Sequence, residues 1–323
     1  MELLKLTSAR QRGHPSHVAC SVKARAPCAH SSLSRGRRLK SNQDGKSTGV
    51  RVSTANTIDD GTTGAEVLTE VLGNVLLIVL NRPTAGNSIN AALALDVENA
   101  LLQLDTDPEL RVGIVTGAGN KMFCAGADLK ALAAGESLFP DRDVNRGMSV
   151  LFRHAVHKPL IAAVNGAALG GGTEIALACD LVVASEDAMF GLPEVTRGLV
   201  AAGGGALRLP RQISLKLAMG ILLLGSRIDA QTAASFSLVN RVVLGDQVRA
   251  EALKMAEVIA ADAPLAVQAS KRIALEGMTF GVMQDPELWS WRDGVARSAL
   301  RSRDAREGPR AFAEKRAPQW TGS

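Results

Sequence analysis

A regular pattern of apolar residues begins at residue 66, after a polar N-terminal stretch without apolar periodicity. Residues 67–71 form one short apolar segment, and residues 75–80 form a second. Gly73-Asn74 between them is typical of a hairpin turn, so the pattern predicts two paired strands. A helix capped by Asn87 or Ser88 should follow, because apolar residues then recur at helical spacing. These residues are Leu93, Val97, Leu101 and Leu104.

Three later apolar segments repeat this theme, at residues 112–115, 160–164 and 181–184. Each segment is short and ends in small or turn-forming residues before a loop and a helical pattern. Repeated units of this kind predict an α/β fold with a mostly parallel sheet, covered by helices and carrying functional loops at the strand ends. Beyond Asp246 only helices are predicted, at 248–261 and from Pro264, because proline suits the first turn of a helix.

Charge is unevenly distributed along the chain. Residues 1–58 hold 11 Lys/Arg and two acidic residues, a balance of +9, so the remaining residues carry −4 of the formal net charge of +5. The main body is therefore mildly acidic, and its charge does not suggest nucleic acid as a partner. The Ser-, Arg- and Gly-rich stretch cannot bury enough apolar surface to offset its conformational entropy. We expect a disordered basic N-terminal extension, either a transit peptide or the product of a misassigned start codon.

Length and composition limit the other possibilities. With 323 residues, 46% of them apolar, the chain can form one large domain and a smaller appendage. Four cysteines, two of them in the extension, argue against a disulfide framework and for a reducing compartment. No apolar run approaches the roughly 20 residues of a membrane span. The histidines and cysteines between positions 14 and 30 fit no common zinc spacing, so no metal is expected.

Several enzyme classes lack their characteristic residues here. The chain has no tyrosine, which excludes mechanisms that need a phenolic base. It also lacks the glycine motifs of Rossmann and P-loop proteins, the nucleophile elbow of serine hydrolases and the H-E-x-x-H motif of zinc proteases. The candidate chemistry therefore has to come from other residues.

Two loops rich in small residues can bring backbone N–H groups close to a ligand. Residues 169–174, Leu-Gly-Gly-Gly-Thr-Glu, lead into a predicted helix whose N-terminus favours negative charge, so they can form an oxyanion hole. A glycine turn that only permits close packing would have the same sequence. In the second loop, residues 123–130, Asp128 can cap a helix, and Lys130 can reach an anionic group or remain a solvated surface lysine.

Two glutamates follow these loops at a suggestive spacing. Glu194 comes 20 residues after Glu174 and follows the apolar segment of residues 190–193. Apolar neighbours would raise the pKa of the Glu194 carboxyl group and suit it to donate a proton. Each glutamate alone is typical of a surface or capping residue. Both together, beside two loops of small residues, indicate an acid/base pair.

Five ordered blocks of residues resemble the enoyl-CoA hydratase/isomerase (crotonase) superfamily over residues 66–320, with the pattern closest to that of enoyl-CoA hydratases. The blocks are Asn81-Arg82-Pro83 and residues 123–130, 165–180, 190–194 and 312–320. The resemblance implies a crotonase-like spiral of ββα units over residues 65–250. It also implies a C-terminal helical oligomerisation region over residues 251–323.

The same resemblance implies roles for individual residues. Backbone N–H groups of Ala127 and Gly171 would form an oxyanion hole for a thioester oxygen, and Glu174 and Glu194 would flank a water molecule. CoA and substrate would be bound by Ala125, Ala127, Asp128, Leu129, Lys130 and Gly171. The implied reaction is the reversible addition of water to the 2,3 double bond of a trans-2-enoyl-CoA, as in fatty acid β-oxidation. It needs no cofactor, because CoA is part of the substrate. A homotrimer or a hexamer built from two trimers is implied as well.

Several alternatives stay open. Superfamily members with carboxylates placed elsewhere act as isomerases or carry out other CoA chemistry. A specialised acyl-CoA dehydratase is a second hypothesis. A third, from another functional class, is an RNA-binding protein that uses the basic extension. Many relatives have Pro-Gly-Ala-Gly-Gly where this chain has Ala-Ala-Gly-Gly-Gly at residues 201–205, which we expect to alter the pocket more than the mechanism. Residues 132–145, which face the acyl site in relatives, show no distinctive pattern and leave acyl specificity open. The enzyme would be cytoplasmic if bacterial, or mitochondrial if the extension is a transit peptide.

Overall fold

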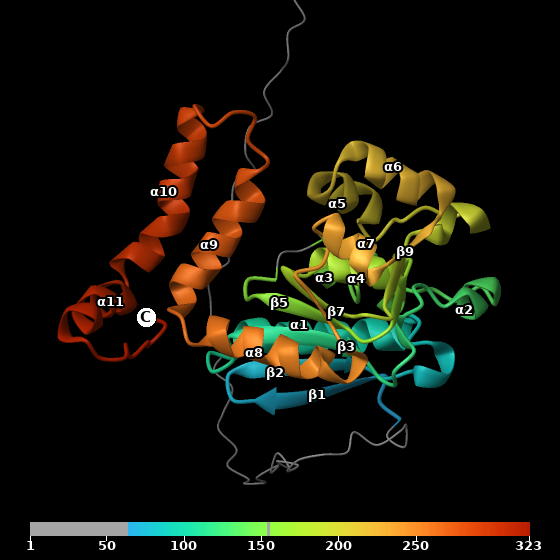
Figure 1. The fold of residues 1–323 in the computed structure, drawn as a ribbon, viewed down its shortest axis with the longest axis horizontal. Coiled ribbons are helices and arrows are strands. Elements are labelled where there is room, and N and C mark those ends of the chain that lie inside the picture. Colours follow the sequence, from blue (N-terminus) through green and yellow to red (C-terminus); the bar gives the residue numbers. More distant parts are fainter. Residues whose placement is uncertain (1–63, 154–155) are drawn as a thin grey trace, which may run out of the picture. The chain divides into compact units, whose positions relative to one another are not determined.

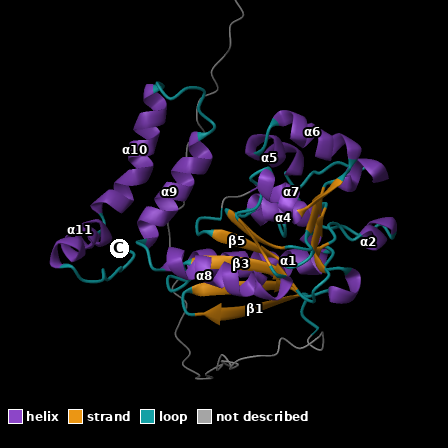
Figure 2. Cartoon of the chain, in the orientation of Figure 1, coloured by secondary structure: helices purple, strands orange, loops and turns teal. Residues whose placement is uncertain are grey.

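The computed structural model describes residues 64–153 and 156–323. The predicted extension, residues 1–58, lies outside these ranges, together with its histidines and cysteines. Figure 1 traces the described chain along its sequence, and Figure 2 distinguishes its helices from its strands. Two sheets and their covering helices make up the described part, which confirms the predicted α/β class.

The larger sheet has six strands in the order β1-β2-β3-β5-β7-β10. The first two are antiparallel, and the others pair in parallel. A tight turn joins the antiparallel pair, and Gly73 in it has a φ of 61°, which favours glycine. The predicted hairpin is thereby confirmed. The strands are β1 (Val67–Leu72), β2 (Val75–Leu80), β3 (Val112–Gly117), β5 (Leu160–Val164), β7 (Leu181–Ser185) and β10 (Arg241–Val243).

The smaller sheet has four short strands in the order β4-β6-β8-β9. Its strands β4, β6 and β8 pair in parallel, and each follows a strand of the larger sheet along the chain. Each turn of the chain thus contributes one strand to each sheet, as in the predicted spiral of ββα units. The hydrophobic pattern did not reveal these strands, because three residues are too few to show a period. They are β4 (Met122–Cys124), β6 (Ala167–Leu169), β8 (Met189–Gly191) and β9 (Arg227–Asp229).

Helices follow most of these strands (Figure 2). The α-helices are α1 (Ala91–Thr106), α2 (Leu129–Ala133), α3 (Ser149–Arg153), α4 (Gly171–Ala178), α5 (Gly205–Gln212), α6 (Leu215–Leu224), α7 (Ala230–Ser235), α8 (Val248–Ala260), α9 (Pro264–Gly277), α10 (Pro286–Arg301) and α11 (Arg303–Glu314). Short 3-10 helices occur at η1 (Pro83–Ala85), η2 (Pro140–Arg142), η3 (Pro193–Arg197) and η4 (Gly245–Gln247).

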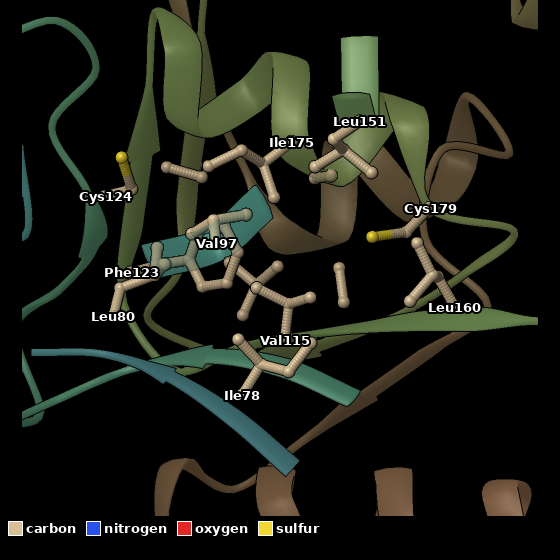
Figure 3. Close-up of a cluster of buried hydrophobic side chains, with 14 of the residues drawn as sticks. Ile78, Leu80, Val97, Val115, Phe123, Cys124, Leu151, Leu160, Ile175 and Cys179 are labelled. Carbon is tan, nitrogen blue, oxygen red and sulfur yellow. The ribbon is translucent and has the colours of Figure 1, made fainter. Parts of the chain in front are cut away.

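Alternate residues of β2 point into two separate hydrophobic cores. Leu76, Ile78 and Leu80 pack in the core that contains the buried face of α1, part of which Figure 3 shows around Val97. Val75, Leu77 and Val79 pack in the second core, on the opposite face of the sheet, against α8. All six β2 residues are buried, which explains why this strand is continuously apolar instead of alternating.

The N-terminal cap of α1 corrects one prediction. Neither Asn87 nor Ser88 caps the helix; Asn90 does, and its side-chain oxygen accepts a hydrogen bond of 2.8 Å from Leu93 N. Asn87 is fully buried at a φ of 52°, and its side chain stabilises the preceding loop by donating to the carbonyl oxygens of Ala118 and Met122. The sequence pattern could not separate these roles, because both asparagines lie within one turn of the helix start.

The C-terminal helices begin at α8, which packs on β3, β5 and β7. The predicted boundary at residue 250 therefore falls inside a helix that contributes to the second core. Pro264 is the first residue of α9, as predicted. Lys271 on α9 forms an ion pair of 2.7 Å with Asp180, which follows α4. In the residues that the structure describes, no helix is both long and apolar enough to cross a membrane.

Candidate active site

A cavity of about 990 Å³ contains every residue that the sequence assigned to catalysis or to CoA binding. The first loop of small residues lines it through residues 125–130, and the second loop through residues 169–171. The two glutamates line it as well. The loops follow β4 and β6, which are neighbouring parallel strands of the smaller sheet. Because parallel strands end at the same edge, residues more than 40 positions apart meet there.

The first loop leaves one backbone donor unused. Ile89 N donates to Gly126 O at 2.8 Å, and Asp128 N donates to Ile89 O at 2.9 Å. These two bonds fix the peptide units on either side of Ala127. Within residues 64–153 and 156–323, the Ala127 N–H has no hydrogen-bond acceptor. It is therefore free to bind an oxygen atom in the cavity.

The second donor comes from the start of α4. Gly170 precedes this helix with a φ of 55°, and Gly171 is its first residue, whose N–H belongs to the first turn and lacks an intrahelical acceptor. A Cβ atom added at Gly126 would lie 2.9 Å from Gly171 N. The two backbones thus approach each other closely only because both residues are glycine. The loop that carries the Ala127 N–H therefore packs against the start of α4, where Gly171 supplies the second candidate donor.

Glu174 lies one turn into α4 and is 5% exposed. Its Oε1 atom accepts a hydrogen bond of 2.8 Å from Gly205 N. Burial raises the pKa of Glu174 to about 7, and the charge of Glu194 acts in the same direction. The hydrogen bond from Gly205 and the charge of Arg208 oppose this increase. A carboxyl group that titrates near neutral pH can both accept and donate protons.

Glu194 reaches the same cavity from η3, which follows β8. Its Oε2 atom is buried and has no hydrogen-bond partner among the described residues. Burial raises the pKa of this carboxyl group, as the apolar sequence around it predicted. The Oε1 atom would lie 3.2 Å from a Cβ added at Gly170, so the carboxyl group is next to the start of α4. The charge of Glu194 in turn raises the pKa of Glu174.

The remaining predicted residues lie at the opening of the cavity. Ala125, Leu129 and Lys130 are exposed and line it. The carboxylate of Asp128 is already occupied: it caps α2 through Lys130 N and Ala131 N and forms an ion pair of 2.9 Å with Arg82. Asp128 is thus bound to its own loop, which limits the part that it can take in contacting CoA.

Sequence reasoning did not assign three features that contact these groups. Arg82, within the Asn-Arg-Pro motif, joins Asp128 to Ser88 through its guanidinium. The glycine segment 203–205 holds Glu174, although its sequence suggested only a change of pocket shape. Arg208 approaches Glu174 from α5. The only sequence signal for the glycine segment and for Arg208 was three consecutive glycines before an amphipathic helix.

Taken together, the cavity combines two free N–H donors with two carboxyl groups of raised pKa, one buried and one half-buried. The donors can stabilise negative charge that develops on a carbonyl oxygen. The carboxyl groups can move protons at neighbouring carbon and oxygen atoms. Across the described part of the chain, no group of three or more His, Cys, Asp or Glu residues is arranged to hold a metal ion.

Comparison with known proteins places this chain in a family. The enoyl-CoA hydratase/isomerase family matches residues 70–323. A carnitinyl-CoA dehydratase from Proteus mirabilis is 43% identical over 257 residues, which cover 77% of this chain and 96% of that protein. The solved structure of an enoyl-CoA hydratase from Mycobacterium tuberculosis H37Rv covers 80% of this chain and 100% of its own, with a TM-score of 0.75 and 45% identity. That of a carnitinyl-CoA dehydratase from Mycobacterium avium 104 has a TM-score of 0.64 and 48% identity, with coverages of 80% and 100%. The chain therefore belongs to the enoyl-CoA hydratase/isomerase (crotonase) family.

Proposed function

We propose that this enzyme catalyses the reversible addition of water to the 2,3 double bond of a trans-2-enoyl-CoA. The observation that carries the proposal is the pair of carboxyl groups of raised pKa, those of buried Glu174 and half-buried Glu194, in one cavity with the free N–H groups of Ala127 and Gly171. Hydration needs this set: one group to accept a proton, one to donate a proton, and donors for the thioester oxygen. The names of the similar proteins, which are hydratases and dehydratases, support the same reaction.

The reaction divides the protons between the two glutamates. Ionised Glu174 accepts a proton from water, whose oxygen bonds to C3, while neutral Glu194 gives a proton to C2. The double bond becomes a single bond, and negative charge moves onto the thioester oxygen in the transition state. The Ala127 and Gly171 N–H groups bind that oxygen. The hydrogen bond from Gly205 favours the ionised form of Glu174 against burial, which raises the pKa of this carboxyl group to about 7. Burial and the unpartnered Oε2 atom favour the neutral form of Glu194.

The proposal includes no metal and no redox cofactor, since each proton and electron pair stays within substrate, water and the two carboxyl groups. It extends to a homotrimer or a hexamer of two trimers. Large apolar side chains on the surface of the described chain support such an assembly. They include Leu215, Leu223 and Leu224 on α6 and Phe312 on α11. The relatives named above are bacterial, which favours the cytoplasm over the mitochondrial matrix as the site of the reaction.

A second candidate reaction is the dehydration of carnitinyl-CoA, which the names of two similar proteins favour. That substrate ends in a quaternary ammonium group, which needs an acidic or aromatic binding site. The lining of the cavity includes the exposed Glu136, two phenylalanines and further apolar residues; the phenylalanines are Phe139 and Phe152, and the other apolar residues include Leu138 and Met148. The acidic and aromatic side chains suit a cationic acyl group, and the apolar ones suit an apolar acyl group, so product analysis has to decide between the two reactions.

Substitution of each glutamate tests the proposed reaction. Glu174→Gln and Glu194→Gln should each lower the rate of crotonyl-CoA hydration by several orders of magnitude, because an amide can neither take nor give the required proton. Binding of a saturated acyl-CoA should change little, since the N–H donors remain. Glu186→Gln, an exposed residue in the turn between β7 and β8, is the matched control and should keep full activity.

The assay follows loss of the conjugated thioester absorbance and identifies the product. Near-normal hydration by both active-site variants would refute the roles of the two glutamates. Conversion of a 3-enoyl-CoA without hydration of the 2-enoyl-CoA would make the enzyme an isomerase instead. Faster dehydration of carnitinyl-CoA than of 3-hydroxybutyryl-CoA would select the second candidate.

A further inference from the structure

Arg208 on α5 is a half-buried arginine that takes no direct part in the proposed reaction. Its Nη2 atom donates a hydrogen bond of 2.8 Å to Phe152 O, at the end of α3. Its Nη1 atom donates to Gly203 O at 3.4 Å. The guanidinium therefore connects α3 to the glycine segment 203–205. Arg208 does not line this cavity; it lines a second one, together with Cys179 and Asp180.

The same glycine segment encloses the carboxyl group of Glu174. Gly205 N donates to Oε1, and a Cβ atom added at Gly203 would lie 2.6 Å from Oε2 and 2.7 Å from the Phe152 ring. Both residues that accept hydrogen bonds from Arg208 thus border the carboxyl group. The position of Glu174 depends on a segment that Arg208 anchors.

Arg208 also acts on Glu174 through its charge. Burial lowers the pKa of Arg208, and the negative charge of Glu174 opposes this effect. Arg208 forms no ion pair with any carboxylate of the described residues, so its half-buried charge is stabilised most when Glu174 is ionised. Glu194 has the opposite effect on Glu174. The Cys179 thiol near Arg208 stays neutral at pH 7, because burial raises its pKa to about 12.

We infer that Arg208 is a positioning residue for Glu174: its hydrogen bonds hold the glycine segment against the carboxyl group, and its charge favours the ionised form that accepts a proton from water. The inference rests on the proposed hydration, in which Glu174 is the proton acceptor. Arg208 acts only through Glu174 and does not touch the substrate. Loss of Arg208 should accordingly affect turnover more than substrate binding.

The pH dependence of Arg208→Met tests this role. In the wild type, hydration should fall below about pH 7 as Glu174 takes up a proton. Without the positive charge, the same acidic limb of kcat should move to higher pH by about half to one unit. At pH 7 kcat should fall about 10-fold or more, with KM changed less than about 3-fold, because the displaced carboxyl group reacts less well. Part of the lost rate should return as the pH is raised.

Two variants on the same helix separate this effect from loss of folding. Arg208→Lys retains the charge and should keep the acidic limb near its wild-type position. Arg211→Met replaces an exposed arginine at the C-terminal end of α5 and should match the wild type. Among the residues that the structure describes, the Arg211 side chain donates a hydrogen bond to Leu207 O alone. A limb that stays in place in Arg208→Met, or a loss of kcat that is equal at every pH, would overturn the inference.

A titration without turnover distinguishes this inference from the proposed function. Carbon-13 NMR of carboxyl-labelled glutamate, with Glu174→Gln used for assignment, follows the ionisation of Glu174 in the wild type and in Arg208→Met. A higher titration midpoint in Arg208→Met supports the inference, whether or not the wild type hydrates an enoyl-CoA. Absence of hydration by the wild type would overturn only the proposed reaction. An identical midpoint in both proteins would refute the role of Arg208.

Discussion

Gly203→Ala tests how closely the wall of the cavity fits Glu174. The structure leaves no room for a methyl group at this position, since the added Cβ atom would lie 2.6 Å from Glu174 Oε2 and 2.7 Å from Phe152 Cε2. Gly203 does not have a positive φ, so alanine meets no backbone strain there. The substitution thus changes the space beside the carboxyl group and leaves the backbone conformation allowed.

The size of the effect follows from the distances. A separation of 2.6 Å falls about 0.8 Å short of the 3.4 Å at which ordinary van der Waals contact begins. The Phe152 ring prevents the alanine methyl group from moving away from Glu174, so the carboxyl group has to move by most of this distance of about 0.8 Å. Displacement of a reacting group by about 1 Å costs on the order of 100-fold in rate. We expect Gly203→Ala to lower kcat for crotonyl-CoA hydration by about 30- to 100-fold with little change in KM.

The assay compares Gly203→Ala with Gly220→Ala in parallel steady-state kinetics. Gly220 lies within α6, and a Cβ atom added there meets nothing within 4 Å. Alanine at that position should keep full activity and raise the melting temperature slightly, because it favours the helix. A wild-type kcat for Gly203→Ala, with an unchanged melting temperature, would refute the argument that this segment sets the position of Glu174.

Two further predictions follow from the same site. Gly126→Ala should lower kcat by about 100- to 1000-fold, because the Ala127 N–H would lose its direction. Gly126 has a φ of 88°, and an added Cβ atom would lie 2.8 Å from Leu169 O. Steady-state kinetics measure this loss, and activity within threefold of the wild type would contradict the prediction. Glu174→Gln should unfold at higher denaturant concentration than the wild type near pH 8. Burial raises the pKa of Glu174 from 4.5 to about 7, so the native state keeps a proton that the unfolded state releases, and stability falls as the pH rises through that window. The free energy of unfolding should rise by on the order of 2–3 kcal/mol in the variant near pH 8, and this increase should vanish below about pH 4.5. An equal increase at both pH values would contradict the reasoning.

The glycine-rich block at residues 169–174 illustrates how far a sequence motif leads. It indicated backbone donors at a helix N-terminus, and the structure places a helix start there with Gly171 as its first residue. The block could not show which other loop would face it. That pairing depends on β4 and β6 being neighbours in the smaller sheet, and neither strand is long enough to be recognised from its residues.

The surroundings of Glu174 illustrate the opposite case. Its position after a glycine turn suggested a catalytic carboxyl group, but nothing near it in the sequence indicated a pKa of about 7. That value arises from burial in α4, from the charges of Glu194 and Arg208 and from the hydrogen bond of Gly205, residues that lie 20 to 34 positions away. Such contacts form only when η3 and α5 fold back over α4, and a local pattern carries no information about them.

The sequence by itself determined the class of fold, the spiral of repeated units and the candidate residues, because periodicity, glycine turns and ordered motifs are properties of short segments. It predicted the hairpin and the helices after residue 246 for the same reason. Only the tertiary structure decided that Asn90 caps α1, that Asp128 is paired with Arg82, and that the glycine segment 203–205 holds Glu174. These features depend on distances between segments far apart in the chain, and such distances are set by the packing of the two sheets and their helices.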